Sequence, residues 1–130
     1  MALAVKDVMT EEPVTVGRQQ SIAVAHALMR SNRCTHLPVL EHGELVGVVS
    51  QQDLYLVETL ANADGVRDRV DDAMRRATLR VTPDAPIADV ALAMVRESST
   101  CAVVVERDRV VGVFTATDAL AVLAKLGRAS

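Results

Sequence analysis

Two short stretches of the chain, GVVSQQD (47–53) and GVFTATD (112–118), share the pattern Gly-x-x-Ser/Thr-x-x-Asp and lie sixty-five positions apart. Shifting the whole chain by the same sixty-five residues, without a gap, pairs many other positions. The pairs include Val5 and Val70, Met9 and Met74, Ile22 and Ile87, and Glu41 and Glu106. A repeat of this length indicates two copies of one unit. Because one copy alone is too small to bury enough apolar surface, we expect the two copies to form a pseudo-symmetric pair.

The periodicity of apolar residues predicts the order β-α-β-β-α in each copy, preceded by a short helical piece. The predicted elements are strands at 13–16 and 78–81, amphipathic helices at 21–32 and 86–98, hairpins at 36–50 and 101–115, and helices that begin after Ser50 and Thr115. The hairpin corners are His42-Gly43 and Arg107-Asp108. We place the boundary between the copies after residue 62, so that residues 1–62 form one unit and 63–130 the other.

Composition excludes several classes of protein. The chain has 130 residues, a net charge of −3, one Tyr, one Phe and no Trp, which does not match a nucleic-acid binder. No apolar run approaches the roughly 20 residues of a membrane-spanning helix, and the N-terminus does not resemble a signal peptide, so we expect a cytoplasmic protein without membrane contact. The two cysteines and three histidines do not have the spacing of metal ligands or of catalytic groups. We therefore expect neither a metal site nor an enzyme. Cys34 and Cys101 fit buried hydrophobic positions, with a redox switch as the alternative.

The repeated Gly-x-x-Ser/Thr-x-x-Asp pattern has two interpretations. Ser50 with Asp53, and Thr115 with Asp118, match the start of a helix at which a hydroxyl and a carboxylate cap backbone N–H groups. The same groups also suit a nucleotide, because phosphate favours a helix N-terminus and a carboxylate accepts the hydroxyls of a ribose. Gly47 and Gly112 lie inside predicted strands, where glycine commonly marks the close approach of a ligand or of another backbone.

The two copies resemble the CBS domain, named after cystathionine beta-synthase, and their tandem order resembles the CBS pair called a Bateman module. The resemblance covers residues 5–126 and rests on VMTEEPVTV and RCTHLPVLEHGELVGVVSQQDL in the first copy. In the second copy it rests on AMRRATLRVTPDAPIADVALAMV and CAVVVERDRVVGVFTATDAL. It implies an α/β fold of two units related by a pseudo-twofold axis, each a small three-stranded sheet packed with helices.

The resemblance also implies clefts for adenosine-containing ligands such as AMP, ADP, ATP or S-adenosylmethionine. Asp53 and Asp118 would hold ribose hydroxyls, and Ser50 and Thr115 would meet phosphate. The adenine would lie beside the backbone around Val16, Arg80 and Val81, with Val39, Val104, Gly47 and Gly112 nearby. Many members carry basic residues before the second strand. Here Thr35-His36 and Thr100-Cys101 occupy those positions, so His36 is either a phosphate ligand or a buried neutral side chain. Pro38 at the start of that strand is replaced by Val103 in the second copy.

The resemblance therefore implies a stand-alone regulatory module, not an enzyme, that senses an adenosine metabolite and signals to a protein partner in trans. It further implies a homodimer, for which Leu120, Leu123 and Leu126 on the last helix offer an apolar face. The alternative interpretation of that face is that it covers its own sheet. The alternative function is an oligomerisation or protein-interaction module without a ligand.

Overall fold

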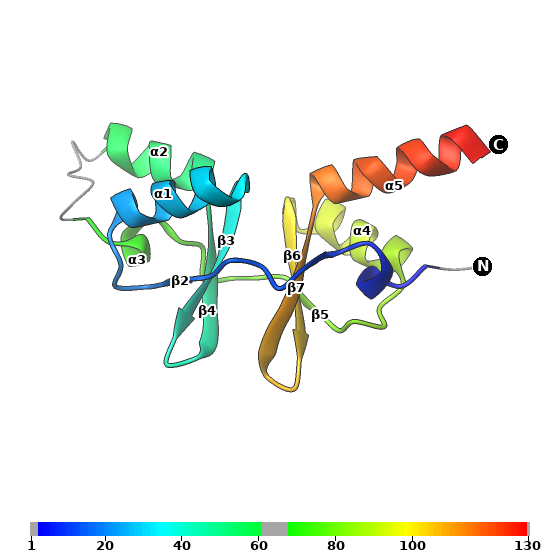
Figure 1. Cartoon of the computed structure of the whole chain (residues 1–130), viewed down its shortest axis with the longest axis horizontal. Helices are drawn as coiled ribbons and strands as arrows, with labels where there is room; N and C mark the ends of the chain where they lie inside the picture. The colour runs from blue at the N-terminus through cyan, green and yellow to red at the C-terminus, as the bar shows by residue number, and fades with distance from the viewer. Residues whose placement is uncertain (1–2, 61–67, 130) are drawn as a thin grey trace. The chain divides into compact units, whose positions relative to one another are not determined.

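The computed structural model describes residues 3–60 and 68–129. These residues divide into two compact units, shown in Figure 1. We call them the first unit (14–60 with 68–78) and the second unit (79–129 with 3–13), after the copy that supplies each sheet. The predicted boundary after residue 62 falls outside the described residues. Within them, the segment that precedes each copy packs with the other copy.

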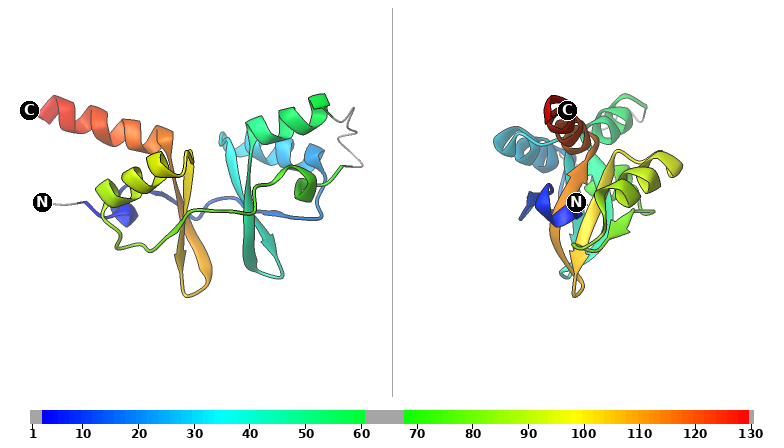
Figure 2. Two further views of the ribbon diagram at one scale, coloured as in Figure 1. Left: turned by 180° about the vertical axis from the view of Figure 1, so that it is seen from behind. Right: turned by 90° about the vertical axis from the view of Figure 1, so that its right-hand side faces the viewer.

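The first unit has a three-stranded sheet of order β2-β3-β4. Its elements are β2 (Val16–Gly17), α1 (Ile22–Asn32), β3 (His36–Glu41), β4 (Glu44–Ser50), α2 (Gln51–Leu60) and α3 (Val70–Ala73). Strand β2 runs parallel to β3, and β3 and β4 form an antiparallel hairpin. Helices α1 and α2 lie side by side in both views of this unit (Figures 1 and 2). They are joined by contact of the His26 and Tyr55 rings, whose centroids are 5.1 Å apart.

The second unit has the sheet order β1-β7-β6-β5. Its elements are η1 (Val5–Asp7), β1 (Thr10–Glu11), β5 (Arg80–Val81), α4 (Ile87–Arg96), β6 (Cys101–Glu106), β7 (Arg109–Thr115) and α5 (Ala116–Ala129). The predicted third strand of each sheet is present, but β1 adds a fourth strand here, which the sequence did not predict. In the first unit the equivalent residues make only the single bridge between Val48 and Arg75.

The apolar residues that repeat at sixty-five positions form the two cores. In the first unit Ile22, Leu37, Val49 and Leu54 are fully buried, and in the second Phe114 fills the corresponding interior. Both predicted hairpin corners are confirmed, with positive φ at His42 (52°) and Gly43 (81°) and at Arg107 (51°) and Asp108 (64°). Such angles match the twist of two-residue hairpin turns.

Two differences from the sequence prediction concern the short strands and the last helix. The strands expected at 13–16 and 78–81 shrink to two residues each, because only Val16–Gly17 and Arg80–Val81 pair with the neighbouring strand. The C-terminal turns of α5 extend away from their own sheet (Figures 1 and 2), and the Leu123 side chain is 63% exposed. The face formed by Leu120, Leu123 and Leu126 therefore does not cover that sheet.

In residues 3–60 and 68–129, no helix is long and apolar enough to cross a membrane.

Candidate functional site

Six of the candidate residues form two equivalent rows across the sheets. In the first unit Val16 pairs with Val39, and Val39 pairs with Gly47. In the second unit the row consists of Val81, Val104 and Gly112. The side chains of Val16, Val39 and Val104 are at most 2% exposed and belong to the cores. A role for these three residues in adenine binding remains a prediction, and it would have to use their backbone atoms.

The glycines of both rows lie under protein segments. A Cβ added at Gly47 would be 2.5 Å from the carbonyl oxygen of Arg75, and one added at Gly112 would be 2.4 Å from the sulfur of Met9. Both distances are shorter than a normal contact, so a larger residue at either position would have to displace its neighbour. The close approach predicted at these glycines is present, and the approaching group is the segment that precedes the other copy. Contact with a ligand at either glycine remains a prediction.

The second group of candidates gathers where the last strand of each hairpin ends. In the first unit His36 pairs with Ser50 across β3 and β4. The Ser50 hydroxyl accepts a hydrogen bond from the Asp53 N–H (3.0 Å), and the Asp53 carboxylate accepts one from the Ser50 N–H (3.0 Å). This reciprocal pair is the capping box predicted from the sequence.

The Asp53 carboxylate has a second partner that the sequence analysis missed. Its Oδ1 atom accepts a hydrogen bond from Nε of Arg75 at 3.2 Å, while Oδ2 caps α2. Asp53 is only 8% exposed, whereas the Arg75 side chain is 72% exposed and covers it from outside. Both oxygens of this carboxylate are therefore occupied by protein donors. The sequence does contain one indication of this pair. When the two copies are aligned, Arg75 stands where the other segment has the uncharged Thr10.

Thr115 and Asp118 form the equivalent capping box in the second unit. Oδ2 of Asp118 accepts hydrogen bonds from the Thr115 N–H (2.9 Å) and hydroxyl (3.2 Å), and the Thr115 hydroxyl accepts one from the Asp118 N–H (3.3 Å). Within the described part of the chain, no donor contacts Oδ1 of Asp118. This carboxylate is also less buried than that of Asp53. The two copies thus share a capping geometry but differ in the oxygen that is left for a ligand.

Asp118 borders a hollow of about 270 Å³ between η1 and α5. Asp7 and Lys125 also line it, together with apolar side chains that include Met9 and Val122. The hollow therefore combines a free carboxylate oxygen, a cation and apolar surface, which are the groups that small polar ligands commonly require.

The remaining polar candidates are placed as follows. Burial lowers the pKa of His36 below its ordinary value of 6.5, although the nearby Asp53 carboxylate opposes this shift, so the ring is neutral at neutral pH. One of its nitrogens lies 3.1 Å from the Thr35 hydroxyl. At neutral pH the uncharged His36 ring provides no positive charge to attract a phosphate group. It can still form a hydrogen bond to a phosphate oxygen. Pro38 is buried within β3, and Arg80 is exposed on β5.

The two cysteines lie in different units and differ in burial. Burial raises the pKa of the Cys101 thiol to about 12, with a smaller contribution from the Asp118 charge, and burial also raises the pKa of the Cys34 thiol. Both thiols are therefore protonated and weakly nucleophilic at neutral pH. In residues 3–60 and 68–129, no cluster of three or more His, Cys, Asp or Glu side chains could hold a metal ion.

Comparisons with known proteins agree with this architecture. The sequence model of a family described as CBS domain matches residues 5–57 and 70–125. A homoserine O-acetyltransferase from Methanococcoides burtonii is 36% identical over 117 residues, which are 88% of this chain and 23% of that enzyme. The chain thus spans about a quarter of that relative's length.

Two solved structures share the fold over nearly the whole chain. The CBS domain pair of protein MJ0100, in complex with 5′-methylthioadenosine and S-adenosyl-L-methionine, has a TM-score of 0.88 and 25% identity, and the match covers 96% of this chain and 98% of that one. The structure of CBSX2 in complex with AMP has a TM-score of 0.77 and 25% identity, and the match covers 95% of this chain and 98% of that one. The ligands of both proteins contain adenosine.

Proposed function

This chain belongs to the CBS domain family as a tandem pair, and we propose that it is a regulatory module that binds an adenosine-containing ligand at Asp118. The observation that carries the proposal is the free Oδ1 atom of Asp118, which lies beside a hollow at the N-terminus of α5. A carboxylate oxygen in this setting can accept a hydrogen bond from each hydroxyl of a ribose. The adenosine ligands of the two related structures support the same class of compound.

We assign different roles to the two copies. A ligand at Asp53 would have to share Oδ1 with Arg75 or displace it, and the Asp53 carboxylate is poorly exposed. Asp118 needs no such rearrangement. The second copy is therefore the ligand site, with Thr115 placed beside the phosphate or the equivalent substituent of the ligand. In the first copy the Ser50 and Asp53 pair caps α2.

We propose that occupancy of this site is signalled through α5. A ligand shifts a protein between two arrangements only by its difference in affinity for them. A ligand at Asp118 contacts α5, so occupancy can change the position of this helix and the partner that binds it. We place this regulation in the cytoplasm, where adenosine metabolites are available, and we propose no catalysis by the CBS pair.

A homodimer is the assembly that we propose for the α5 face. Leu120, Leu123 and Leu126 are 65%, 63% and 57% exposed, and an apolar groove of about 800 Å³ runs between α4 and α5. The same groove supports the second candidate function, an oligomerisation module without a ligand. Leu123→Glu is expected to convert the dimer into a monomer in analytical ultracentrifugation. Thr117→Glu, on an exposed polar position of the same helix, should leave it dimeric.

A ligand panel separates the two functions. Thermal unfolding is measured with AMP, ADP, ATP, S-adenosylmethionine, NADH and GMP, and with 2′,3′-dideoxyadenosine monophosphate as the matched control without ribose hydroxyls. A ligand at about a hundred times its dissociation constant adds roughly 2.7 kcal/mol, which shifts the midpoint by several degrees. We expect a shift with at least one adenosine ligand and its loss with the dideoxy compound. No shift with any compound would favour the oligomerisation module.

A further inference from the structure

We propose that opposite charge patterns on the two segments that precede the copies specify which unit each segment packs against. The first leading segment comprises residues 3–12 and the second comprises residues 68–77. Each packs against the sheet of the copy that it does not precede. This inference concerns the pairing of segments and does not depend on any ligand.

The backbone contacts of the two segments are equivalent at their short helices. Val5 and Lys6 donate hydrogen bonds to the carbonyl oxygens of Ala85 (2.8 Å) and Pro83 (3.1 Å). At the repeated positions, Val70 and Asp71 donate to the carbonyl oxygens of Gln20 (2.8 Å) and Arg18 (2.9 Å).

The apolar anchors are equivalent too, because Val5 and Val70 are fully buried and Met9 and Met74 lie over the two glycines. The contacts at the short helices and at the two methionines therefore do not distinguish one segment from the other. The side chains that differ between the segments, above all the charged ones, can supply the choice of partner.

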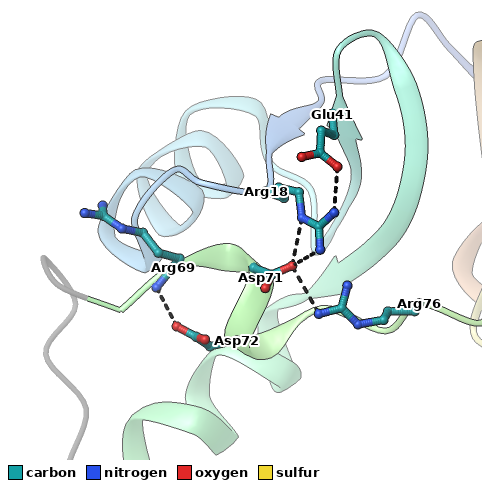
Figure 3. A network of polar contacts seen from close by, with 6 residues as sticks. All are labelled: Arg18, Glu41, Arg69, Asp71, Asp72 and Arg76. Atoms are coloured by element: carbon teal, nitrogen blue, oxygen red, sulfur yellow. Dashed lines mark hydrogen bonds and ion pairs between the residues drawn. The ribbon is translucent and has the colours of Figure 1, made fainter.

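The first difference is a reversal of charge at the short helices. In the second unit Nζ of Lys6 lies 2.7 Å from the Asp84 carboxylate. In the first unit Asp71 occupies the position of Lys6, and its Oδ1 accepts hydrogen bonds from Nη2 (2.6 Å) and Nε (2.9 Å) of Arg18. Figure 3 shows the Arg18 guanidinium between Asp71 and Glu41. These contacts raise the pKa values of Lys6 and Arg18 and lower that of Asp71.

Exchange of the segments would bring like charges together at these positions. Lys6 would face Arg18 on the first unit, and Asp71 would face Asp84 on the second. Like charges in contact disfavour the wrong partner, even where each correct pair is only weakly stabilising.

A second reversal follows five residues later in each segment. Glu11 lines a hollow of about 530 Å³ together with Arg107 and Arg109 of the second unit. Arg76 takes the place of Glu11 in the other segment, where its partner at 3.2 Å is Asp71 of the same segment (Figure 3).

Exchange would again be unfavourable at this second position. The residues of the first unit that correspond to Arg107 and Arg109 are His42 and Glu44. Glu11 would therefore approach Glu44, and Arg76 would approach two arginines and the single acid Glu106. At these two positions the segments carry the orders positive then negative, and negative then positive. Contacts with the unit match the charge at the first position of both segments, and Glu11 lies beside two arginines at the second position of its segment.

Engineered cysteines report which pairing forms. Ala4 and Pro86 are antiparallel bridge partners, and so are Ser21 and Arg69. Such partners have Cα atoms about 4.5–5.5 Å apart, within the reach of a disulfide. In the full chain with Cys34→Ala and Cys101→Ala, the pair Ala4→Cys/Pro86→Cys detects the observed pairing. The pair Ala4→Cys/Ser21→Cys detects the exchanged one. Mass spectrometry after mild oxidation measures both yields.

We expect the Ala4–Pro86 disulfide to form almost completely with native charges, and the Ala4–Ser21 disulfide to be rare. Lys6→Asp/Asp71→Lys should reduce the first yield more than twofold and increase the second, within one chain or between two chains. Adding Arg18→Asp/Asp84→Arg should restore the native pattern. Arg30→Asp/Asp89→Lys, which reverses one exposed charge of each sign elsewhere, is the control and should change neither yield.

Unchanged yields in the Lys6→Asp/Asp71→Lys variant would overturn the proposal. If that variant does not fold, the fourfold variant with restored complementarity decides. Recovery of its fold and of the Ala4–Pro86 disulfide supports the proposal, and failure to recover overturns it.

Discussion

Asp53 and Asp118 hold equivalent positions in the two copies and cap equivalent helices, but among the described residues only Asp118 has a carboxylate oxygen that no protein group donates to. The difference originates in the leading segments, because Arg75 reaches Asp53 whereas the repeated position in the other segment is Thr10. A repeated motif therefore does not make a repeated site. The group that completes each site comes from a segment outside the motif, and that segment has diverged more than the motif has.

The largest expected effect is on the free energy of unfolding, and it differs between the two glycines that lie under these segments. Gly47→Ala places its Cβ against the backbone carbonyl of Arg75, which cannot move without shifting the segment, and we expect a loss of about 3 kcal/mol in unfolding free energy. Gly112→Ala mainly meets the flexible side chain of Met9, so about 1.5 kcal/mol is expected. Urea denaturation of both variants provides the comparison. Equal losses of unfolding free energy would contradict the expectation that the Met9 side chain can move aside more easily than the Arg75 backbone.

Replacing Arg75 tests the origin of the asymmetry. Arg75→Thr introduces the residue of the second copy and frees Oδ1 of Asp53, so titration calorimetry with AMP should show two sites per chain instead of one. Unfolding free energy should fall by less than about 1 kcal/mol, because Arg75 is 72% exposed. Binding that becomes weaker at an unchanged stoichiometry would mean that Arg75 contacts the ligand directly.

The first helices of the copies differ in capping. The Ser21 hydroxyl accepts a hydrogen bond from the Val24 N–H at 3.2 Å, whereas Pro86 begins α4 without a side-chain cap. Ser21→Ala is therefore expected to cost about 1 kcal/mol, measured by thermal unfolding. Pro86→Ala removes no such bond and serves as the comparison. A similar loss in both variants would show that the hydroxyl contributes little.

The smallest expected effect is a dependence of stability on pH. The pKa of His36 is lowered by folding, so the unfolded chain binds a proton first as the pH falls below about 6.5, and stability decreases in that range. His36→Gln should lose less stability between pH 6.5 and 5 than the native chain. Its counterpart Cys101 has a pKa of about 12 and does not titrate in that range. Identical pH profiles would contradict the shift.

Much of the fold could be predicted from the sequence because each pattern of apolar and polar residues occurs twice, once in each copy. The apolar spacing of Ile22, Ala25 and Met29 predicted α1, and a polar corner between two apolar runs predicted each hairpin; the structure confirms both. The fourth strand of the second sheet was missed because two residues, Thr10 and Glu11, carry no periodic pattern. Their pairing depends on contact with β7, which lies about a hundred residues further along the chain.

The candidate site was predictable only in part. The capping boxes at Ser50 and Thr115 could be recognised because hydroxyl and carboxylate are three residues apart. The bond between Arg75 and Asp53 joins residues 22 positions apart, and no local pattern indicates it. The reversal between Lys6 and Asp71 was visible in the aligned copies, but its meaning required knowing which unit each segment contacts.

Titration calorimetry with AMP and S-adenosylmethionine on the native chain, Asp53→Asn and Asp118→Asn tests the central claim most directly. We predict one site per chain for at least one of these ligands. Its affinity should fall at least tenfold in Asp118→Asn, equivalent to about 1.4 kcal/mol, and should change less than twofold in Asp53→Asn. Loss of binding in Asp53→Asn but not in Asp118→Asn, or no binding of either ligand to the native chain, would contradict the account.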